Sequence, residues 1–206
     1  MSRTWNAILA VLLFAVVAPG VDRPPPTPVE PDQTRVAYTP AQQEAIDWAV
    51  GRFELIGFEL PEVEISFFPT TESCRHADGL YQQIDDRHVL SICVREWDTA
   101  ANTMHRRRTV AHELAHAWEH ENLDEHAREE LMAVLDVEAW YSADVTWKDR
   151  GGERLAETIV WGLFDQPRRQ VLIDQPCAEL HRDFIAITGH TALGPISGNC
   201  APDHVT

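Results

Sequence analysis

The stretch RTVAHELAHAWEH, residues 108–120, contains the pattern His-Glu-x-x-His. On an α-helix, residues four apart lie one above the other on nearly the same face, about 6 Å apart along the axis. His112 and His116 can therefore direct two ring nitrogens at one zinc ion, at about 2.0–2.1 Å each. Glu113 lies beside them around the helix, where it can take a proton from a metal-bound water instead of binding the ion. The stretch thus predicts a helix that carries a catalytic zinc site.

The residues around this motif favour a buried helix. Two apolar rows at i, i+4 spacing run along the stretch, and no Gly or Pro interrupts them. The rows consist of Val110, Leu114 and Trp118, and of Ala111 and Ala115. The alternative is an amphipathic helix with two satisfied or solvated histidines, which the small alanines beside the histidines disfavour.

Length and composition indicate one acidic globular domain. The chain has 206 residues, 44% of them hydrophobic, and a formal net charge of −16. This length is sufficient for one domain with a sizeable core. The acidic balance argues against nucleic acid and against an anionic membrane surface as partners. We expect a monomer.

The N-terminus predicts export. Residues 1–20 are typical of a secretory signal peptide, with Arg3 before an apolar run at residues 7–18 and small residues after it. The run is shorter than a membrane span of about 20 residues. An uncleaved signal anchor that tethers the protein to a membrane stays open, because Pro19 is a poor neighbour for a cleavage site. Residues 21–38 are rich in proline and predict an extended linker, so the folded domain is expected at 39–206.

Four dispersed cysteines are consistent with a secreted or cell-envelope protein. In an oxidising compartment they predict two disulfide bonds, for which three pairings exist. We favour Cys74–Cys93 and Cys177–Cys200, because each pair brackets one local unit. A cysteine ligand to the metal is the alternative.

The sequence pattern predicts an α+β domain with a small mixed or antiparallel sheet packed on the motif helix and a helical C-terminal half. Thr39-Pro40-Ala41-Gln42 is a capping-box start for a first helix that ends at Gly57. Strands are expected at 63–67, 79–84 and 88–94, the last two joined in a hairpin by residues 85–87. Later helices are expected at 103–121, 125–137, 152–164 and 177–188.

A catalytic zinc site needs a third protein ligand and an open position. A histidine six residues after the second is excluded, because Asn122 occupies that position and Glu119 occupies that of the accompanying glycine. The other common source is a glutamate on a later helix. Glu153 and Glu157 are four residues apart there, so one can bind the ion while the other holds a ligand histidine by its second ring nitrogen. An exposed acidic helix start, favoured by the helix dipole, is the alternative without a metal.

His-Glu-Leu-Ala-His at 112–116, followed by Glu-Arg-Leu-Ala-Glu at 153–157, resembles the gluzincin metallopeptidases. The resemblance implies a zincin-like fold, Zn²⁺ as cofactor, Glu153 as the third ligand and Glu157 as the supporting carboxylate. It also implies hydrolysis of a peptide bond, in which Glu113 accepts the water proton and delivers it to the leaving amine. In this family a Tyr or His stabilises the oxyanion, and Tyr141 is our candidate, with a buried aromatic as the alternative.

The resemblance further implies that a peptide or protein substrate lies extended along an edge strand, at 79–84 or 88–94. Two other functions are open: a non-catalytic binding module of the cell envelope, and a hydrolase of a non-peptide amide such as a cell-wall amide. The intact Glu113 speaks against the binding module, because a structural metal site needs no base. The arginines at 106–108 are interpreted as a solvated first helical turn, with contact to substrate carboxylates as the alternative.

Overall fold

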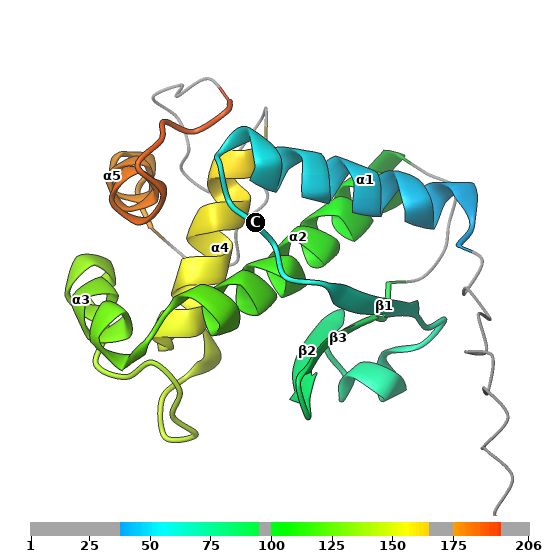
Figure 1. Cartoon of the computed structure of the whole chain (residues 1–206), viewed down its shortest axis with the longest axis horizontal. Coiled ribbons are helices and arrows are strands. Elements are labelled where there is room, and N and C mark those ends of the chain that lie inside the picture. Colours follow the sequence, from blue (N-terminus) through cyan, green and yellow to red (C-terminus); the bar gives the residue numbers. More distant parts are fainter. Residues whose placement is uncertain (1–37, 95–99, 165–174, 195–206) are drawn as a thin grey trace, which may run out of the picture. The chain divides into compact units, whose positions relative to one another are not determined.

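The computed structural model describes residues 38–94, 100–164 and 175–194, which form one mixed α+β domain (Figure 1). The predicted signal peptide, and the predicted linker apart from its last residue, lie outside these ranges. The elements in chain order are α1 (Pro40–Leu55), β1 (Val63–Phe67), η1 (Thr71–Cys74), β2 (Gly79–Ile84), β3 (Arg87–Ile92), α2 (Ala100–Asn122), α3 (Glu125–Leu135), η2 (Trp147–Asp149), α4 (Gly151–Leu163) and α5 (Cys177–Thr188).

The first helix begins where the capping box predicted. The Thr39 side chain accepts a hydrogen bond from the backbone N–H of Gln42, and the Gln42 side chain accepts one from the backbone N–H of Thr39. Pro40 occupies the first helical position, where its missing N–H costs nothing. After the helix, Gly57 adopts a left-handed φ of 72° that reverses the chain toward β1.

The three strands form a mixed sheet in the order β1-β3-β2. β2 and β3 pair antiparallel as the predicted hairpin, whereas β1 pairs parallel with β3. β3 ends at Ile92, so the expectation that the strand continues to 94 is wrong: the Cys93 N–H bonds back to the carbonyl of Asp78 instead. Because β3 lies in the middle, it cannot be the edge strand for a substrate. β2 is the edge on that side of the sheet.

Helix α2 contacts α1, β2, β3 and α4, and both predicted apolar rows face the core. Val110, Leu114, Ala111 and Ala115 are fully buried. Trp118 is partly buried and stacks on Phe58, with ring centroids 4.0 Å apart. Figure 1 shows α2 running between the sheet and α4.

The interpretation of the arginines at 106–108 as a solvated first turn is wrong. The helix begins at Ala100, so these residues lie further along it, and Arg106 is only 2% exposed. Arg107 forms an ion pair with Glu44 of α1, and Arg108 forms one with Glu157 of α4. The charges of Arg107 and Arg108 are thus paired with acids from neighbouring helices, which a single-helix pattern does not reveal.

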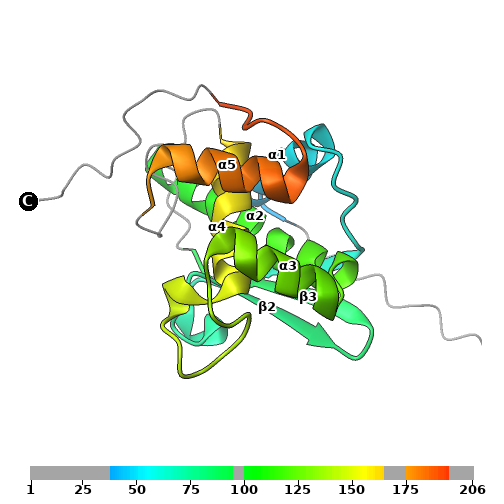
Figure 2. The same cartoon turned by 90° about the vertical axis from the view of Figure 1, so that its left-hand side faces the viewer.

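Helix α4 is almost completely buried and lies between α2 on one side and the pair α3 and α5 on the other (Figure 2). Close packing with α5 depends on Gly162, where a Cβ atom would stand 2.1 Å from the Phe184 ring. At the other end of α4, Glu153 in the first turn faces His112 and His116 on α2.

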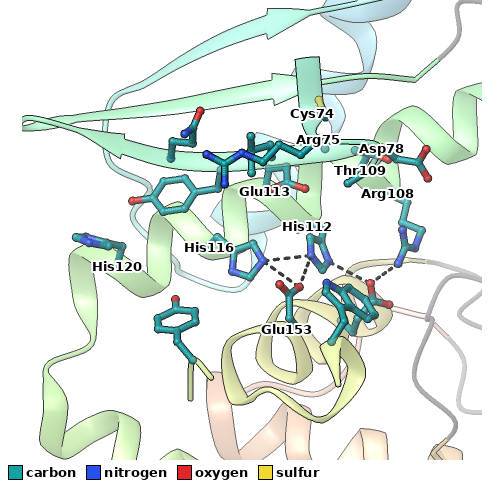
Figure 3. Close-up of a pocket in the computed structure, with 18 of the residues that line it drawn as sticks. Cys74, Arg75, Asp78, Arg108, Thr109, His112, Glu113, His116, His120 and Glu153 are labelled. Atoms are coloured by element: carbon teal, nitrogen blue, oxygen red, sulfur yellow. Dashed lines mark hydrogen bonds and ion pairs between the residues drawn. The ribbon is translucent and has the colours of Figure 1, made fainter. Parts of the chain in front are cut away.

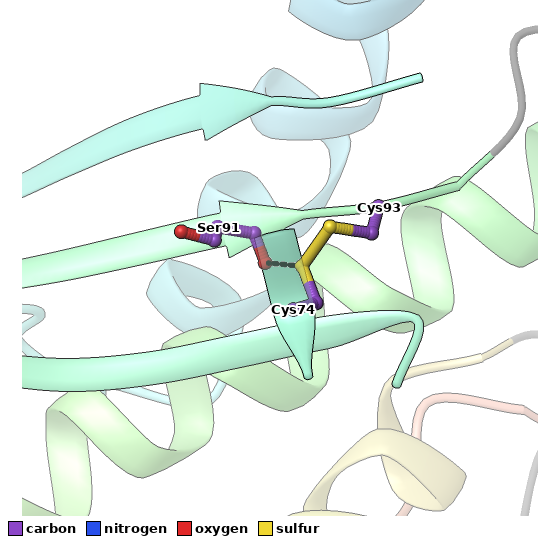
Figure 4. Close-up of a disulfide and its surroundings, with 3 residues drawn as sticks. All are labelled: Cys74, Ser91 and Cys93. Carbon is purple, nitrogen blue, oxygen red and sulfur yellow. Dashed lines mark hydrogen bonds between the residues drawn. A yellow bond between two sulfur atoms is a disulfide. The ribbon is translucent and has the colours of Figure 1, made fainter. Parts of the chain in front are cut away.

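The predicted disulfide Cys74–Cys93 is present and joins η1 to the chain just after β3, with Cα atoms 6.1 Å apart (Figure 4). It fits an exported protein, because disulfide bonds persist in oxidising compartments. Cys200 lies outside the described residues, so the predicted pair Cys177–Cys200 stays a prediction. Within the described ranges, no helix combines the length and apolar character that crossing a bilayer requires.

Candidate metal centre

Three side chains from two helices meet in one cluster (Figure 3). The Nε2 atoms of His112 and His116 on α2 are 3.2 Å apart, and Glu153 Oε2 on α4 lies 3.1 Å and 3.3 Å from them. Four-coordinate zinc at about 2.0–2.1 Å from each ligand requires ligand atoms about 3.3–3.4 Å apart. The cluster has nearly this spacing, so these three residues can hold a metal ion. Residues 38–94, 100–164 and 175–194 contain no second group of this kind.

Two glycines bring Glu153 close to α2. A Cβ atom at Gly151 would stand 2.5 Å from the Trp140 ring, and one at Gly152 would stand 2.8 Å from the Tyr141 ring. Because these positions lack side chains, the start of α4 packs against both aromatic rings, and the Gly151 N–H bonds to the carbonyl of Ala139 at 2.9 Å. Glu153 then projects from the first turn of α4 to the two histidines.

Each histidine presents its other ring nitrogen to a buried carboxylate. His112 Nδ1 lies 3.1 Å from Glu157 Oε1, and Glu157 also binds the Arg108 guanidinium. The sequence left open whether Glu153 or Glu157 is nearer the ion; the structure places Glu153 in the cluster and Glu157 behind His112. Carboxylates in this position orient a ligand histidine and raise its basicity.

The carboxylate behind the second histidine is Glu119, which the sequence analysis missed. Its Oε2 lies 3.5 Å from His116 Nδ1, while its Oε1 accepts hydrogen bonds of 2.6 Å from Trp140 Nε1 and from the Tyr141 hydroxyl. Arg128 Nε lies 3.4 Å from the same oxygen. The available signal was its position three residues after His116 on the same helix, where the two side chains share a face.

Glu113 is buried between α2 and the edge strand β2. A Cβ atom at Gly79 would lie only 2.3 Å from Glu113 Oε1, so the carboxylate occupies the space that a side chain would take there. Burial raises the pKa of Glu113 above its usual 4.5, although His112 and His116 act in the opposite direction. A carboxylate with a raised pKa is a better proton acceptor.

In the metal-free cluster, the histidines and the carboxylates shift each other's pKa values. Burial alone would lower the pKa of His116, but the carboxylates of Glu119 and Glu153 outweigh it and raise that pKa from 6.5 to about 10. The pKa of His112 is also raised, because Glu153 and Glu157 outweigh its burial. Burial would raise the pKa of Glu153, but the two histidines lower it well below its usual range. Without an ion, His116 therefore retains a positive charge at neutral pH.

The cluster opens into a cavity of about 660 Å³ between β2 and the segment that connects α3 to α4. Tyr141 lines it and is 58% exposed, with its hydroxyl directed to Glu119. Two further aromatic residues line the cavity that the sequence analysis did not select. The Trp147 ring stacks over His112 at a centroid distance of 6.0 Å, and the Tyr81 ring stacks over His116 at 6.3 Å. Burial, with smaller effects of Glu119 and Glu121, raises the pKa of Tyr81 to about 12, so its hydroxyl keeps its proton.

No protein-family model, curated protein or solved structure matches the chain.

Proposed function

We propose that the chain is an exported, zinc-dependent metallopeptidase of the gluzincin type with a zincin-like fold. The observation that carries this proposal is the near-tetrahedral spacing of His112, His116 and Glu153 beside a buried Glu113 at the wall of a cavity. Two imidazoles and one carboxylate suit zinc better than they suit magnesium or calcium, which prefer oxygen ligands. The export part of the proposal is supported by the disulfide and by the signal-like N-terminus.

His112, His116 and Glu153 would hold the zinc ion, which would lower the pKa of a water molecule toward about 7 and polarise a carbonyl group. Glu113 takes the proton from the attacking water and returns it to the leaving amine, a role that its raised pKa supports. Glu119 and Glu157 hold the two imidazoles in orientation and supply acceptors for their second ring nitrogens. Tyr141 is the candidate for stabilising the oxyanion: it lines the cavity, and its hydroxyl, which donates to Glu119 in this structure, would turn toward the substrate to take that role.

The free edge of β2 supports a peptide as substrate. In the described part of the chain, β2 pairs only with β3, and most of its residues line the cavity. An extended peptide can therefore add to this edge through backbone hydrogen bonds, which places a peptide bond beside Glu113. A binding module with a structural metal needs neither the buried base nor the open cavity. An iron site with the same ligand types is known in oxygenases, but Glu113 favours hydrolysis.

The test is hydrolysis by the purified, zinc-loaded protein of a complex mixture of peptides, analysed by mass spectrometry, with cell-wall fragments as a second substrate. We expect peptide cleavage by the wild type, none by Glu113→Gln at equal zinc content, and loss of cleavage after chelation that added zinc restores. Cleavage of cell-wall amides without cleavage of peptides would show that the substrate is a non-peptide amide. Absence of hydrolysis in both mixtures at full zinc content would contradict the proposed enzyme and favour the non-catalytic binding module.

A further inference from the structure

Arg75 is a charged side chain of the cavity that the proposed reaction does not use. It lines the cavity together with His112 and Glu113 and is exposed. In Figure 3 its side chain lies on the β2 side of the cleft, above Glu113, and extends away from Asp78. Within the described residues, its guanidinium forms no hydrogen bond or ion pair.

The backbone holds this side chain in a defined place. Cys74, the preceding residue, is tied to Cys93 by the disulfide. Arg75 and His76 both adopt left-handed backbone angles, with φ of 53° and 72°, which are uncommon for residues other than glycine. Backbone hydrogen bonds of Arg75 to Glu72, of His76 to Thr71 and of Ala77 to Cys74, at 3.2, 2.7 and 2.9 Å, close the turn. Arg75 therefore starts from a fixed point at the rim of the cavity.

Of the two arginines that line the cavity, Arg75 has no anionic partner among the residues that the structure describes. The other lining arginine, Arg108, is paired with the buried Glu157. Glu113 and Glu153 together would balance the charge of a divalent ion held in the cluster. The carboxylate of Asp78 lies 3.2 Å from His105 Nε2, on the opposite side from the Arg75 guanidinium in Figure 3. A guanidinium with its donors free is well suited to bind a carboxylate through two parallel hydrogen bonds.

We propose that Arg75 binds a carboxylate of the substrate, so that the enzyme prefers peptides with Asp or Glu close to the bond that is cut. The inference rests on the proposed peptidase function and names its substrate class. The formal net charge of −16 repels acidic peptides at long range. A local, unpaired cation at the site overcomes this repulsion at contact distance, where screening by salt is weakest.

The test maps cleavage sites in a peptide mixture for the wild type, Arg75→Gln, Arg75→Glu and Arg87→Gln, each at measured zinc content. Arg87 is the matched control, because it is an exposed arginine paired with Glu64 outside the cavity. We expect the wild type and Arg87→Gln to enrich Asp and Glu at one position near the cut. For a matched peptide pair, Arg75→Gln should lower the kcat/KM ratio of the acidic peptide over its amide counterpart about fivefold. Arg75→Glu should favour Lys or Arg at the same position.

A cleavage profile that is identical in the wild type and Arg75→Gln would overturn this inference alone, and so would a wild-type profile without acidic enrichment. Absence of cleavage by the zinc-loaded wild type would overturn the proposed function, and this inference with it. Equal zinc content in all variants shows that a changed profile does not come from a damaged metal site.

Discussion

Gly79→Ala changes the position of Glu113 without changing any candidate metal ligand. The new Cβ atom would lie 2.3 Å from Glu113 Oε1 and 2.8 Å from its Cγ and Cδ. Ordinary contact begins near 3.4 Å, so the carboxylate must move by about 1 Å. Gly79 is not among the residues with positive φ, and alanine therefore fits its backbone. The group that moves is a side chain, so the fold should persist.

We expect zinc content to stay unchanged and kcat/KM to fall about a hundredfold, because a shift of about 1 Å in a catalytic group typically costs that much. The assay follows cleavage of the best peptide from the mixture, with zinc measured in the same samples. A folded, zinc-loaded Gly79→Ala protein that retains kcat/KM within about threefold of the wild type would refute the role of Glu113 at this position.

The same substitution has a stability signature. Filling occupied space typically costs about 1–3 kcal/mol, which urea unfolding can measure. In a Glu113→Ala background that cost should largely disappear, because the obstructing carboxyl group is absent. The control is Gly51→Ala in α1, where nothing lies within 4 Å of the new Cβ atom. There we expect a gain of about 0.5–1 kcal/mol and no loss of activity.

Three further outcomes are expected. Glu119→Gln should weaken zinc binding about 10–100-fold in a chelator competition assay. The exposed Glu121→Gln on the same helix should not, and equal affinities would contradict the role of Glu119. The metal-free protein should lose stability in thermal unfolding as pH rises from about 6.5 to about 10, since the folded state holds the His116 proton more tightly than the unfolded chain does. A zinc-loaded sample should not show this loss, because the ion replaces the proton. The same pH dependence of the unfolding temperature in both samples would contradict the role of the His116 proton. Replacing Cys74 and Cys93 together by serine should lower the free energy of unfolding by about 3 kcal/mol in urea, and an unchanged value would show that the bond is not structural.

Local sequence signals predicted the elements and the two histidines. The capping box at Thr39 and the alternation at 63–67 act within a few residues, so the start of α1 and the bounds of β1 follow from them, whereas α1 ends at Leu55, two residues before the predicted Gly57. The spacing of His112 and His116 is likewise a property of one helix. These features needed no knowledge of the tertiary structure.

Features that depend on distant partners were not predictable in the same way. The parallel pairing of β1 with β3 is not encoded in either strand alone. The burial of Arg108 depends on Glu157, which arrives from another helix. Glu119 lies behind His116 because Trp140 and Tyr141 donate hydrogen bonds to its other carboxylate oxygen. The segment that carries these two aromatic residues had no recognisable sequence pattern.

The central claim is that His112, His116 and Glu153 hold one zinc ion while Glu113 is left free for catalysis. Elemental analysis for zinc, iron and manganese in the purified wild type, Glu113→Gln and Glu153→Gln tests it most directly. We expect one zinc per chain in the wild type and in Glu113→Gln, and little in Glu153→Gln. A wild type without zinc, or a Glu153→Gln variant that keeps its zinc while Glu113→Gln loses it, would contradict the account.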